Sequence, residues 1–378
     1  MSMRERRDIV HLQEEGAGAL ITLVRATGST YRRPGARLAI ASDGRFAGTI
    51  SGGCLEADLL RKATWKVRDG AVMEHFSTAF DDTTEIPYGL GCGGEVDLLL
   101  EPAGTPEHAA LLEAMRASLD GEQMLVATML PEEKSTFGRI VVNERGDVLF
   151  ASDWIATDDI VDLRAYLRQK FASPESVFAE AYRTFFFERL EPPQRLFIFG
   201  AGEDARPLVH LASEVGWHVI VADRRAHHAR PERFPEATRV IAHAEIASLG
   251  CNARDAVVLM THSYEEDRRL LAEMLHLQPR YLGLLGARHR SSLLLSEASS
   301  AANLLLHEAC ARLHAPVGLD LGGDGPHAVA LSIVAEIQAA LHDRAAANRG
   351  MTEAEVEAQL REKENTTYSH ACAMDNEL

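Results

Sequence analysis

The sequence predicts an α/β protein that consists of an N-terminal α/β domain with β-hairpins and a C-terminal Rossmann-like domain with a doubly wound parallel sheet. In the C-terminal part, an apolar strand at residues 195–199 runs into Gly200-x-Gly202-x-x-Ala205 and a helix, which is the order of a dinucleotide-binding βαβ unit. In the N-terminal part, two short apolar runs flank Ser42-Asp-Gly-Arg45, a pattern typical of a β-hairpin with a tight turn.

Apolar periodicity and turn residues locate the other elements. In the N-terminal part they predict helices at residues 8–15 and 106–119, and strands at residues 19–24, 37–41, 46–50, 95–100, 124–130, 138–142 and 148–151. In the C-terminal part they predict parallel strands at residues 217–222, 239–241, 256–260 and 281–285, and helices at residues 206–215 and 326–341. Pro326 suits the first turn of the last of these helices.

The composition changes along the chain suggest four segments. Residues 1–157 form the N-terminal domain, and residues 158–194 form a charged helical linker that Glu191-Pro-Pro-Gln194 ends. Residues 195–345 form the Rossmann-like domain. Residues 346–378 form a peripheral helix, expected at residues 352–363, and a frayed tail.

Composition also excludes several classes of protein. The chain has 378 residues, of which 46% are hydrophobic, so it is long enough for two or three globular domains. We expect a cytoplasmic protein, because the sequence shows neither a membrane span nor the apolar core of a signal peptide. The formal net charge of −17 argues against general binding to nucleic acid or anionic membranes. The five cysteines are widely spaced and include no CxxC pair, so the sequence indicates neither a disulfide framework nor a zinc ribbon.

One stretch, Gly48-Thr-Ile-Ser-Gly-Gly-Cys-Leu-Glu-Ala57, combines a strand end, a glycine pair and a cysteine where a helix begins. A helix N-terminus favours anions and lowers the pKa of a thiol, so Cys54 is a candidate reactive or ligand-binding thiolate. Gly52 and Gly53 have no Cβ and would let a ligand approach the backbone. The alternative is a buried structural cysteine after a tight turn.

Two further stretches of the N-terminal part carry candidate ligand-binding groups. The loop before the hairpin contains Ser29, Thr30, Arg32 and Arg33, whose hydroxyl and guanidinium donors could hold an anion, although an ordinary solvated basic loop has the same composition. A second glycine cluster contains Cys92 and leads into the strand at residues 95–100. If the fold brings the two cysteines together, they offer two thiolates to a soft metal, but their spacing of 38 residues does not by itself predict this.

The C-terminal part carries the signals of a nucleotide site and signals against one. Gly200 and Gly202 would face the pyrophosphate, and Asp223 ends the next strand where a ribose-binding acid would lie. However, Glu203-Asp204 places two carboxylates where the pyrophosphate would bind, and they would repel phosphate. After the last parallel strand, Gly286-Ala-Arg288-His-Arg290 places basic groups at the carboxyl edge of the sheet, where ligands bind in such folds.

Taken together, these stretches resemble the xanthine dehydrogenase accessory factors, or XdhC/CoxI family. The resemblance rests on an ordered set of motifs in both parts of the chain: Gly28-Ser-Thr30 with Arg32-Arg33-Pro34-Gly35, Gly48 to Glu56, Gly91-Cys-Gly-Gly94, Gly200-Ala-Gly202, Gly286-Ala-Arg288, and Ala315-Pro-Val-Gly-Leu-Asp-Leu-Gly322 with Pro326 and Ala330 to Glu336.

The resemblance implies a two-domain accessory protein that binds the molybdenum cofactor, protects it during sulfuration, and helps insert it into a molybdenum hydroxylase such as xanthine or carbon monoxide dehydrogenase. A sulfur-donating cysteine desulfurase would be a second partner. Molybdopterin carries a phosphate and a metal with soft sulfur ligands, so Cys54 is the expected principal contact to cofactor and metal, and Cys92 the second. The pair Glu203-Asp204 departs from the family, where histidine and an apolar residue often follow the Gly-Ala-Gly motif.

Two other functions stay open from the sequence. One is an NAD(P)-dependent oxidoreductase in which Cys54 supplies a thiolate; His262 and Tyr264 could serve in hydride transfer, although the sequence has no convincing catalytic set, and Arg224-Arg225 leaves NAD and NADP undecided. The other is a regulatory binding module with a vestigial nucleotide fold. Whichever function applies, we expect a homodimer, because Rossmann-like domains often pair.

Overall fold

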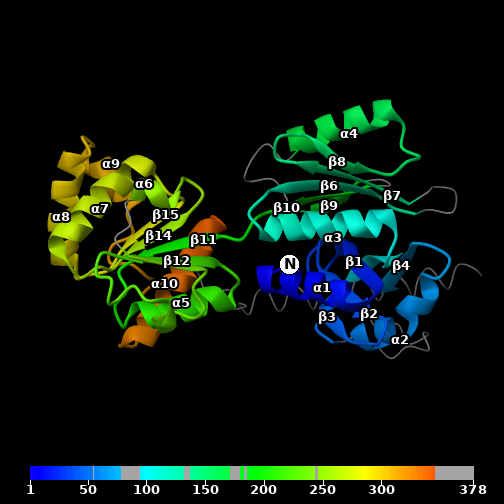
Figure 1. Cartoon of the computed structure of the whole chain (residues 1–378), viewed down its shortest axis with the longest axis horizontal. Coiled ribbons are helices and arrows are strands. Elements are labelled where there is room, and N and C mark those ends of the chain that lie inside the picture. The colour runs from blue at the N-terminus through cyan, green and yellow to red at the C-terminus, as the bar shows by residue number, and fades with distance from the viewer. Residues whose placement is uncertain are drawn as a thin grey trace, which may run out of the picture.

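The computed structural model describes residues 1–53, 55–77, 94–131, 137–170, 179–182, 185–242 and 246–344. The N-terminal half contains two antiparallel sheets and the C-terminal half one parallel sheet, and the chain passes from one half to the other between β10 and β11 (Figure 1). The expected helix at residues 352–363 lies outside the described residues. Within the described ranges no helix is long and apolar enough to span a membrane.

The first sheet has the strand order β3-β2-β1-β5-β4. Its strands are β1 (Ala17–Thr27), β2 (Arg37–Ala41), β3 (Phe46–Gly48), β4 (Val72–Ser77) and β5 (Glu95–Pro102). The predicted hairpin is confirmed, because Leu38 of β2 lies opposite Gly48 of β3. Helix α2 (Glu56–Lys66) covers the outer face of this sheet, where Leu59 and Ala63 pack against apolar residues of β1 and β2.

The second sheet has the strand order β8-β7-β6-β10-β9. Its strands are β6 (Met124–Met129), β7 (Gly138–Asn143), β8 (Val148–Ala151), β9 (Ala179–Tyr182) and β10 (Phe185–Leu190). Helices α1 (Met3–Gly16) and α3 (Pro106–Leu119) fill the space between the two sheets, and their apolar residues share one core with both. Helix α4 (Thr157–Lys170) covers the far face of the second sheet, so the N-terminal half is a stack of alternating helix and sheet layers (Figure 1).

The segment 158–194 differs from the predicted helical linker. Helix α4 covers its beginning, but β10 is an interior strand of the second sheet, between β6 and β9. Glu188 of this strand is buried and pairs with Arg37 of β2. Aromatic residues favour a half-buried pleated surface, which explains why Phe185-Phe-Phe187 is a strand.

The parallel sheet of the C-terminal half has the order β13-β12-β11-β14-β15. Its strands are β11 (Arg195–Phe199), β12 (His218–Asp223), β13 (Arg239–Ala242), β14 (Ala256–Leu259) and β15 (Tyr281–Leu284). Helices α5 (Ala205–Glu214) and α10 (Pro326–Leu341) pack on one face; α7 (Tyr264–Leu277), α8 (Arg288–Ala301) and α9 (Leu306–Arg312) pack on the other, and the short α6 (Ile246–Leu249) follows β13. The doubly wound arrangement that the sequence predicts is therefore confirmed.

The direction of β11 determines where the ligand edge of this sheet lies. Strand β11 starts directly after the crossing from the N-terminal half, and the other four strands run parallel to it. Their carboxyl ends consequently lie on the side of the sheet that faces away from the N-terminal half (Figure 1).

Candidate functional site

Glu56 organises the glycine-rich turn before α2. Its carboxylate accepts hydrogen bonds from the backbone N–H groups of Ile50, Ser51 and Gly53, each at 2.8 Å. The hydroxyls of Thr49 and Ser51 donate to the same carboxylate. Burial raises the pKa of Glu56, but the hydrogen bonds outweigh burial and lower this pKa to about 2.

The turn therefore already holds an anion, which is the carboxylate of Glu56. The sequence predicted a turn that accepts an anionic ligand, whereas its described backbone donors bind within the chain: the N–H of Gly52 donates to Thr49 Oγ1, and the N–H of Leu55 donates to Ser51 Oγ. Within the described part of the turn, the position open to a ligand is Gly53, because a Cβ there would meet no atom within 4 Å, whereas Gly52 lies against Tyr31. Cys54, which follows Gly53 in the sequence, lies outside the described residues, as does Cys92.

The loop at residues 28–35 lies against the described ends of both glycine-rich stretches. A Cβ on Gly52 would lie 3.3 Å from the ring of Tyr31. A Cβ on Gly94 would lie 2.3 Å from the backbone oxygen of Ser29 and 2.9 Å from Thr30 Cγ2, so only a glycine fits there without displacement of the loop. Gly52 and Gly94, which belong to the two glycine-rich stretches that carry cysteines in the sequence, thus both lie beside this loop.

The candidate anion-binding residues of this loop have different roles. Arg32 forms a two-point ion pair with Glu5 of α1, with both N–O distances at 2.8 Å. Thr30 donates its hydroxyl to the carbonyl oxygen of Arg32. Ser29 and Arg33 are exposed, and among the described residues the guanidinium of Arg33 makes no hydrogen bond or ion pair. Arg33 is consequently available to an external anion, whereas Arg32 holds the loop on α1.

In the C-terminal half, Gly200 and Gly202 form the turn between β11 and α5, as the sequence predicted. Gly200 has φ +121°, and a Cβ there would lie 2.2 Å from the carbonyl oxygen of Met260. The requirement for glycine at this position thus comes from the contact with the end of β14. Gly202 has no such backbone contact, because the atom nearest to its open side is the carboxylate of Asp204.

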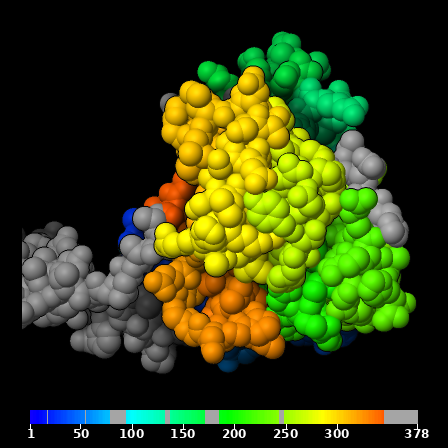
Figure 2. All heavy atoms as spheres, turned by 90° about the vertical axis from the view of Figure 1, so that its left-hand side faces the viewer, coloured from blue at the N-terminus to red at the C-terminus, as the bar shows by residue number. Residues whose placement is uncertain are grey.

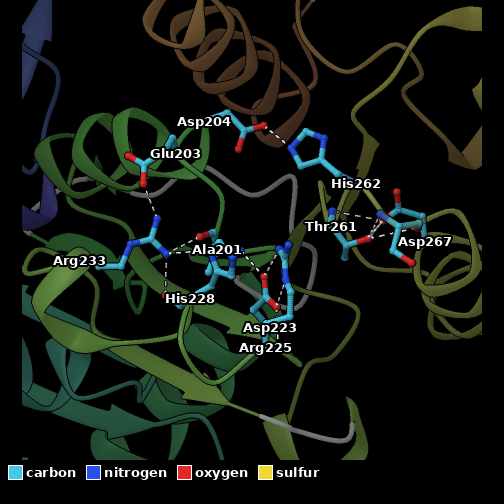
Figure 3. A network of polar contacts seen from close by, with 11 residues as sticks. Ala201, Glu203, Asp204, Asp223, Arg225, His228, Arg233, Thr261, His262 and Asp267 are labelled. Atoms are coloured by element: carbon cyan, nitrogen blue, oxygen red, sulfur yellow. Dashed lines mark hydrogen bonds and ion pairs between the residues drawn. The ribbon is translucent and has the colours of Figure 1, made fainter.

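Asp223 lies at the end of β12, where a ribose-binding acid was expected, but its carboxylate binds within the chain (Figure 3). It accepts hydrogen bonds from the N–H of Ala201 at 2.8 Å and from the backbone and guanidinium of Arg225 at 2.8 to 3.0 Å. Burial raises the pKa of Asp223, but these contacts lower it to about 2. A ribose hydroxyl would have to displace Arg225 to reach this carboxylate.

The two carboxylates at the start of α5 are paired as well (Figure 3). Glu203 contacts Arg233 at 2.6 Å and Arg206 at 3.0 Å, and Asp204 contacts His262 Nε2 at 2.8 Å. The carboxylates of Glu203 and Asp204 are thus held where a pyrophosphate would bind.

The two residues considered for hydride transfer are not paired with each other. His262 contacts Asp204, whereas the hydroxyl of Tyr264 donates to Glu297 at 2.9 Å. Desolvation and the contact with Glu297 raise the pKa of Tyr264, which makes this phenol a weaker acid.

A cavity of about 360 Å³ lies at the carboxyl edge of the parallel sheet, on the α10 side of His262. Its lining includes Gly286, Arg290, Pro316 and Val317. The expected Arg288 is the first residue of α8 and is exposed beside this cavity. Among the described residues, no group of three or more His, Cys, Asp or Glu side chains could hold a metal ion.

Sequence reasoning missed the role of Glu56. Glu56 lies within the stretch from Gly48 to Ala57, where the pattern points to Cys54 and the two glycines instead. A signal was present: an acidic residue three positions after Gly53, in the first turn of a helix, has the spacing by which a side chain returns to the backbone at the helix start.

The chain matches two related family models. A model described as the XdhC Rossmann domain matches residues 196–337, and a model described as the XdhC and CoxI family matches residues 11–77.

Relatives with similar sequences cover most of the chain. It is 28% identical over 331 residues to a probable xanthine dehydrogenase subunit of Bacillus subtilis (strain 168), an alignment that covers 86% of this chain and 94% of that protein. It is 26% identical over 332 residues to the molybdenum cofactor insertion chaperone PaoD of Escherichia coli (strain K12), with 85% and 83% covered. A crystal structure described as a xanthine dehydrogenase from Bacillus halodurans is 25% identical and superposes with a TM-score of 0.75 over 94% of this chain and 99% of that one.

Proposed function

Because the chain belongs to the XdhC and CoxI family, we propose that it is an accessory protein that binds the molybdenum cofactor and helps insert it into a molybdenum hydroxylase. The name of the similar PaoD protein, a molybdenum cofactor insertion chaperone, supports this role. In its finer form the proposal is that the protein protects the cofactor during sulfuration and serves a xanthine or carbon monoxide dehydrogenase.

One observation carries the proposal: the loop at residues 28–35 contacts both glycine-rich stretches, through Tyr31 on Gly52 and through Ser29 and Thr30 on Gly94. Cys54 follows the first of these glycines by two positions, and Cys92 precedes the second by two. This arrangement favours a pocket in which both thiols face one ligand.

The chemistry of the cofactor fits such a pocket. Molybdenum with sulfur ligands is a soft centre, and thiolates are the protein ligands that suit it. Exposed glycines such as Gly53 leave room for a flat pterin ring against the backbone. The cofactor phosphate would not bind in the turn, because the carboxylate of Glu56 already holds its N–H groups; Arg33 offers a guanidinium that has no partner among the described residues. We propose Cys54 as the principal contact and Cys92 as the second.

The proposed protein carries its cargo without turnover of its own. An NAD(P)-dependent oxidoreductase is the less favoured alternative, because Asp223, Glu203 and Asp204 are all engaged within the chain at the usual dinucleotide position. As partners we propose the client hydroxylase, a cysteine desulfurase that supplies sulfur, and a second copy of the chain in a cytoplasmic homodimer.

A binding measurement tests the cofactor proposal. The full-length protein is mixed with molybdenum cofactor and separated by gel filtration, and molybdenum and pterin are measured in the protein fraction. Cys54→Ser should reduce both at least tenfold, while the matched control Cys310→Ser, an exposed thiol on α9, should bind like the wild type. Equal binding by Cys54→Ser and the wild type would refute the assignment of Cys54.

A further inference from the structure

The start of α8 is unusual for a helix N-terminus. Its first three residues are Arg288, His289 and Arg290, and its first turn contains no acidic residue. Ala287 precedes the helix and cannot cap it with a side chain. Cations are unfavourable at the positive end of a helix dipole, and the first N–H groups of a helix need acceptors. An anion at this position would satisfy both.

A second, independent feature lies at the same helix start. Ser291 is only 4% exposed, and its hydroxyl has no hydrogen-bond partner among the residues that the structure describes. A buried hydroxyl without a partner is destabilising, so such a group calls for an explanation. A ligand that accepts a hydrogen bond from Ser291 would supply the missing partner.

The side chains of Arg290 and Ser291 both lie close to Gly286, which lines the cavity together with Arg290. A Cβ at this position would lie 3.3 Å from Arg290 Nη1 and 3.8 Å from Ser291 Oγ. Arg290 is held in place on its other side, because its Nη2 donates to Asp267 Oδ2 at 2.6 Å and Asp267 is fully buried. The remaining contact of Nη1 is a long one of 3.4 Å to the carbonyl oxygen of Leu285, so this nitrogen can still donate to a ligand.

The other residues that line the cavity are partly apolar and partly polar. Pro316, Val317 and Val329 supply apolar surface, and Ser332 and His262 supply polar groups. At about 360 Å³ the cavity lies at the small end of the range for small-molecule sites. The cavity therefore has room for a small organic ligand that carries one charged group, and it is too small for an extended dinucleotide.

We propose that the start of α8 is a binding site for the phosphate group of a phosphorylated small molecule, held by the helix N–H groups, Arg290 and Ser291 above Gly286. A phosphate offers several acceptor oxygens, which suits a helix start together with a guanidinium and a hydroxyl. Helix α8 lies at the end of the C-terminal half that is remote from the N-terminal half, and Figure 2 views the molecule from that end. The site lies at the same edge of the sheet as the β11–α5 turn, because His262 lines the cavity and contacts Asp204. It is separate from the proposed thiol pocket, and it does not depend on the cofactor proposal.

The site is tested by calorimetric titration of the full-length protein with inorganic phosphate and with AMP. Wild type should bind both saturably, and Ser291→Ala should weaken binding about tenfold, which is the size of a lost hydrogen bond to a charged group. The same substitution should leave the melting temperature of the ligand-free protein unchanged or raise it, because it removes an unsatisfied buried hydroxyl.

The matched control is Ser299→Ala in the same helix. Ser299 is 3% exposed, but its hydroxyl donates to the carbonyl oxygen of Ser296 at 3.0 Å, so its loss should lower stability slightly and leave phosphate affinity unchanged. Absence of saturable phosphate and AMP binding by the wild type, or equal affinities in Ser291→Ala and the wild type, would overturn the proposal.

Competition identifies the source of the phosphate. If molybdenum cofactor displaces AMP, the site takes the phosphate of the cofactor; if it does not, the site takes a free nucleotide. Cys54→Ser should bind AMP like the wild type, so a failure of the thiol pocket is distinguishable from a failure of this site.

Discussion

Glu56 gives the glycine-rich turn its own internal anion. The N–H groups that would otherwise attract a ligand's phosphate bind this carboxylate, and the turn is thereby fixed at the start of α2. This contact changes the expected division of labour at the site. The described part of the turn presents the open side of Gly53, and recognition of phosphate must come from other residues.

Replacement of Glu56 by glutamine should lower the free energy of unfolding by about 1 to 3 kcal/mol, because the amide nitrogen cannot accept hydrogen bonds from the donors of the turn. The pKa of Glu56 is lowered to about 2, so its stabilising effect should be complete above its unfolded-state value near 4.5 and lost as the pH falls toward 2. Denaturant unfolding at several pH values measures this. The control Glu113→Gln, on the exposed surface of α3, should change stability by less than about 0.5 kcal/mol. An equally small effect at Glu56 would show that the carboxylate does not hold the turn.

The sequence identified residue types at the site better than it identified their partners. Glycines beside a cysteine at the start of a helix are a local pattern, and they could be recognised. That Arg32 would pair with Glu5, and Asp223 with Arg225, depends on side-chain choices among several acceptors within reach. Such choices follow from the packed structure and leave no periodic trace in the sequence.

The turn between β11 and α5 has the glycine pattern of a nucleotide-binding turn, but its contacts stabilise the packing of the sheet. Gly200 lies against the end of β14, and Asp223 ties the same turn to the end of β12 through Ala201. The turn thus joins three neighbouring strands of the sheet at their carboxyl edge.

Gly200→Ala should therefore destabilise the C-terminal half by about 3 kcal/mol or more, since it combines a positive φ with a backbone clash. In the matched control Gly202→Ala the added Cβ would meet the side chains of Asp204 and His262 but no backbone atom, so it should cost less than about 1 kcal/mol. Hydrogen exchange of the β11 and β14 amides reports this half separately. Similar protection in both variants would contradict the packing role of Gly200.

Helices and strands with clear apolar periodicity could be predicted from the sequence. A strand that buries charged residues among apolar ones could not. The strands of the parallel sheet and the helix α10 follow from apolar runs with turn residues at their ends. Strand β10 lies in the segment that was expected to be a charged helical linker, yet its charged residues Glu188 and Arg189 are buried. The partner that allows Glu188 to be buried is Arg37 of the other sheet, and a partner so distant in the sequence cannot be read from a local pattern.

Buried ion pairs join the two antiparallel sheets of the N-terminal half. Arg139 of β7 contacts both carboxylate oxygens of Glu101 of β5 at 3.0 Å, and both side chains are at most 1% exposed. The charge of Arg139 opposes the effect of burial and keeps the pKa of Glu101 below its usual value. The pair fixes how the sheets lie on either side of α3.

Arg139→Met should lower the free energy of unfolding by about 3 to 5 kcal/mol, because it leaves the carboxylate of Glu101 buried without a counter-charge. The double variant Arg139→Met/Glu101→Leu should recover most of this loss. Arg45→Met, which removes an exposed pair with Glu15, serves as the control and should cost less than about 1 kcal/mol. Thermal and denaturant unfolding measure all three; a loss in the double variant as large as in Arg139→Met would contradict the explanation.

The two halves place their candidate sites on different sides of the protein. The loop at residues 28–35 belongs to the N-terminal half, whereas the carboxyl edge of the parallel sheet faces away from it (Figure 1). A ligand held by the proposed thiol pocket would thus leave the cavity beside α8 free.

The cofactor affinity of Gly94→Ala, compared with that of Gly18→Ala, tests whether the loop and both glycine-rich stretches form one pocket. Each added Cβ would press on a backbone oxygen of the N-terminal half, that of Ser29 at 2.3 Å and that of Ile40 at 2.9 Å, but only the first lies in the proposed pocket. With both variants folded by circular dichroism, we expect Gly94→Ala to bind molybdenum cofactor at least tenfold more weakly than the wild type and Gly18→Ala to retain its affinity. Undiminished binding by Gly94→Ala would contradict a pocket at this loop.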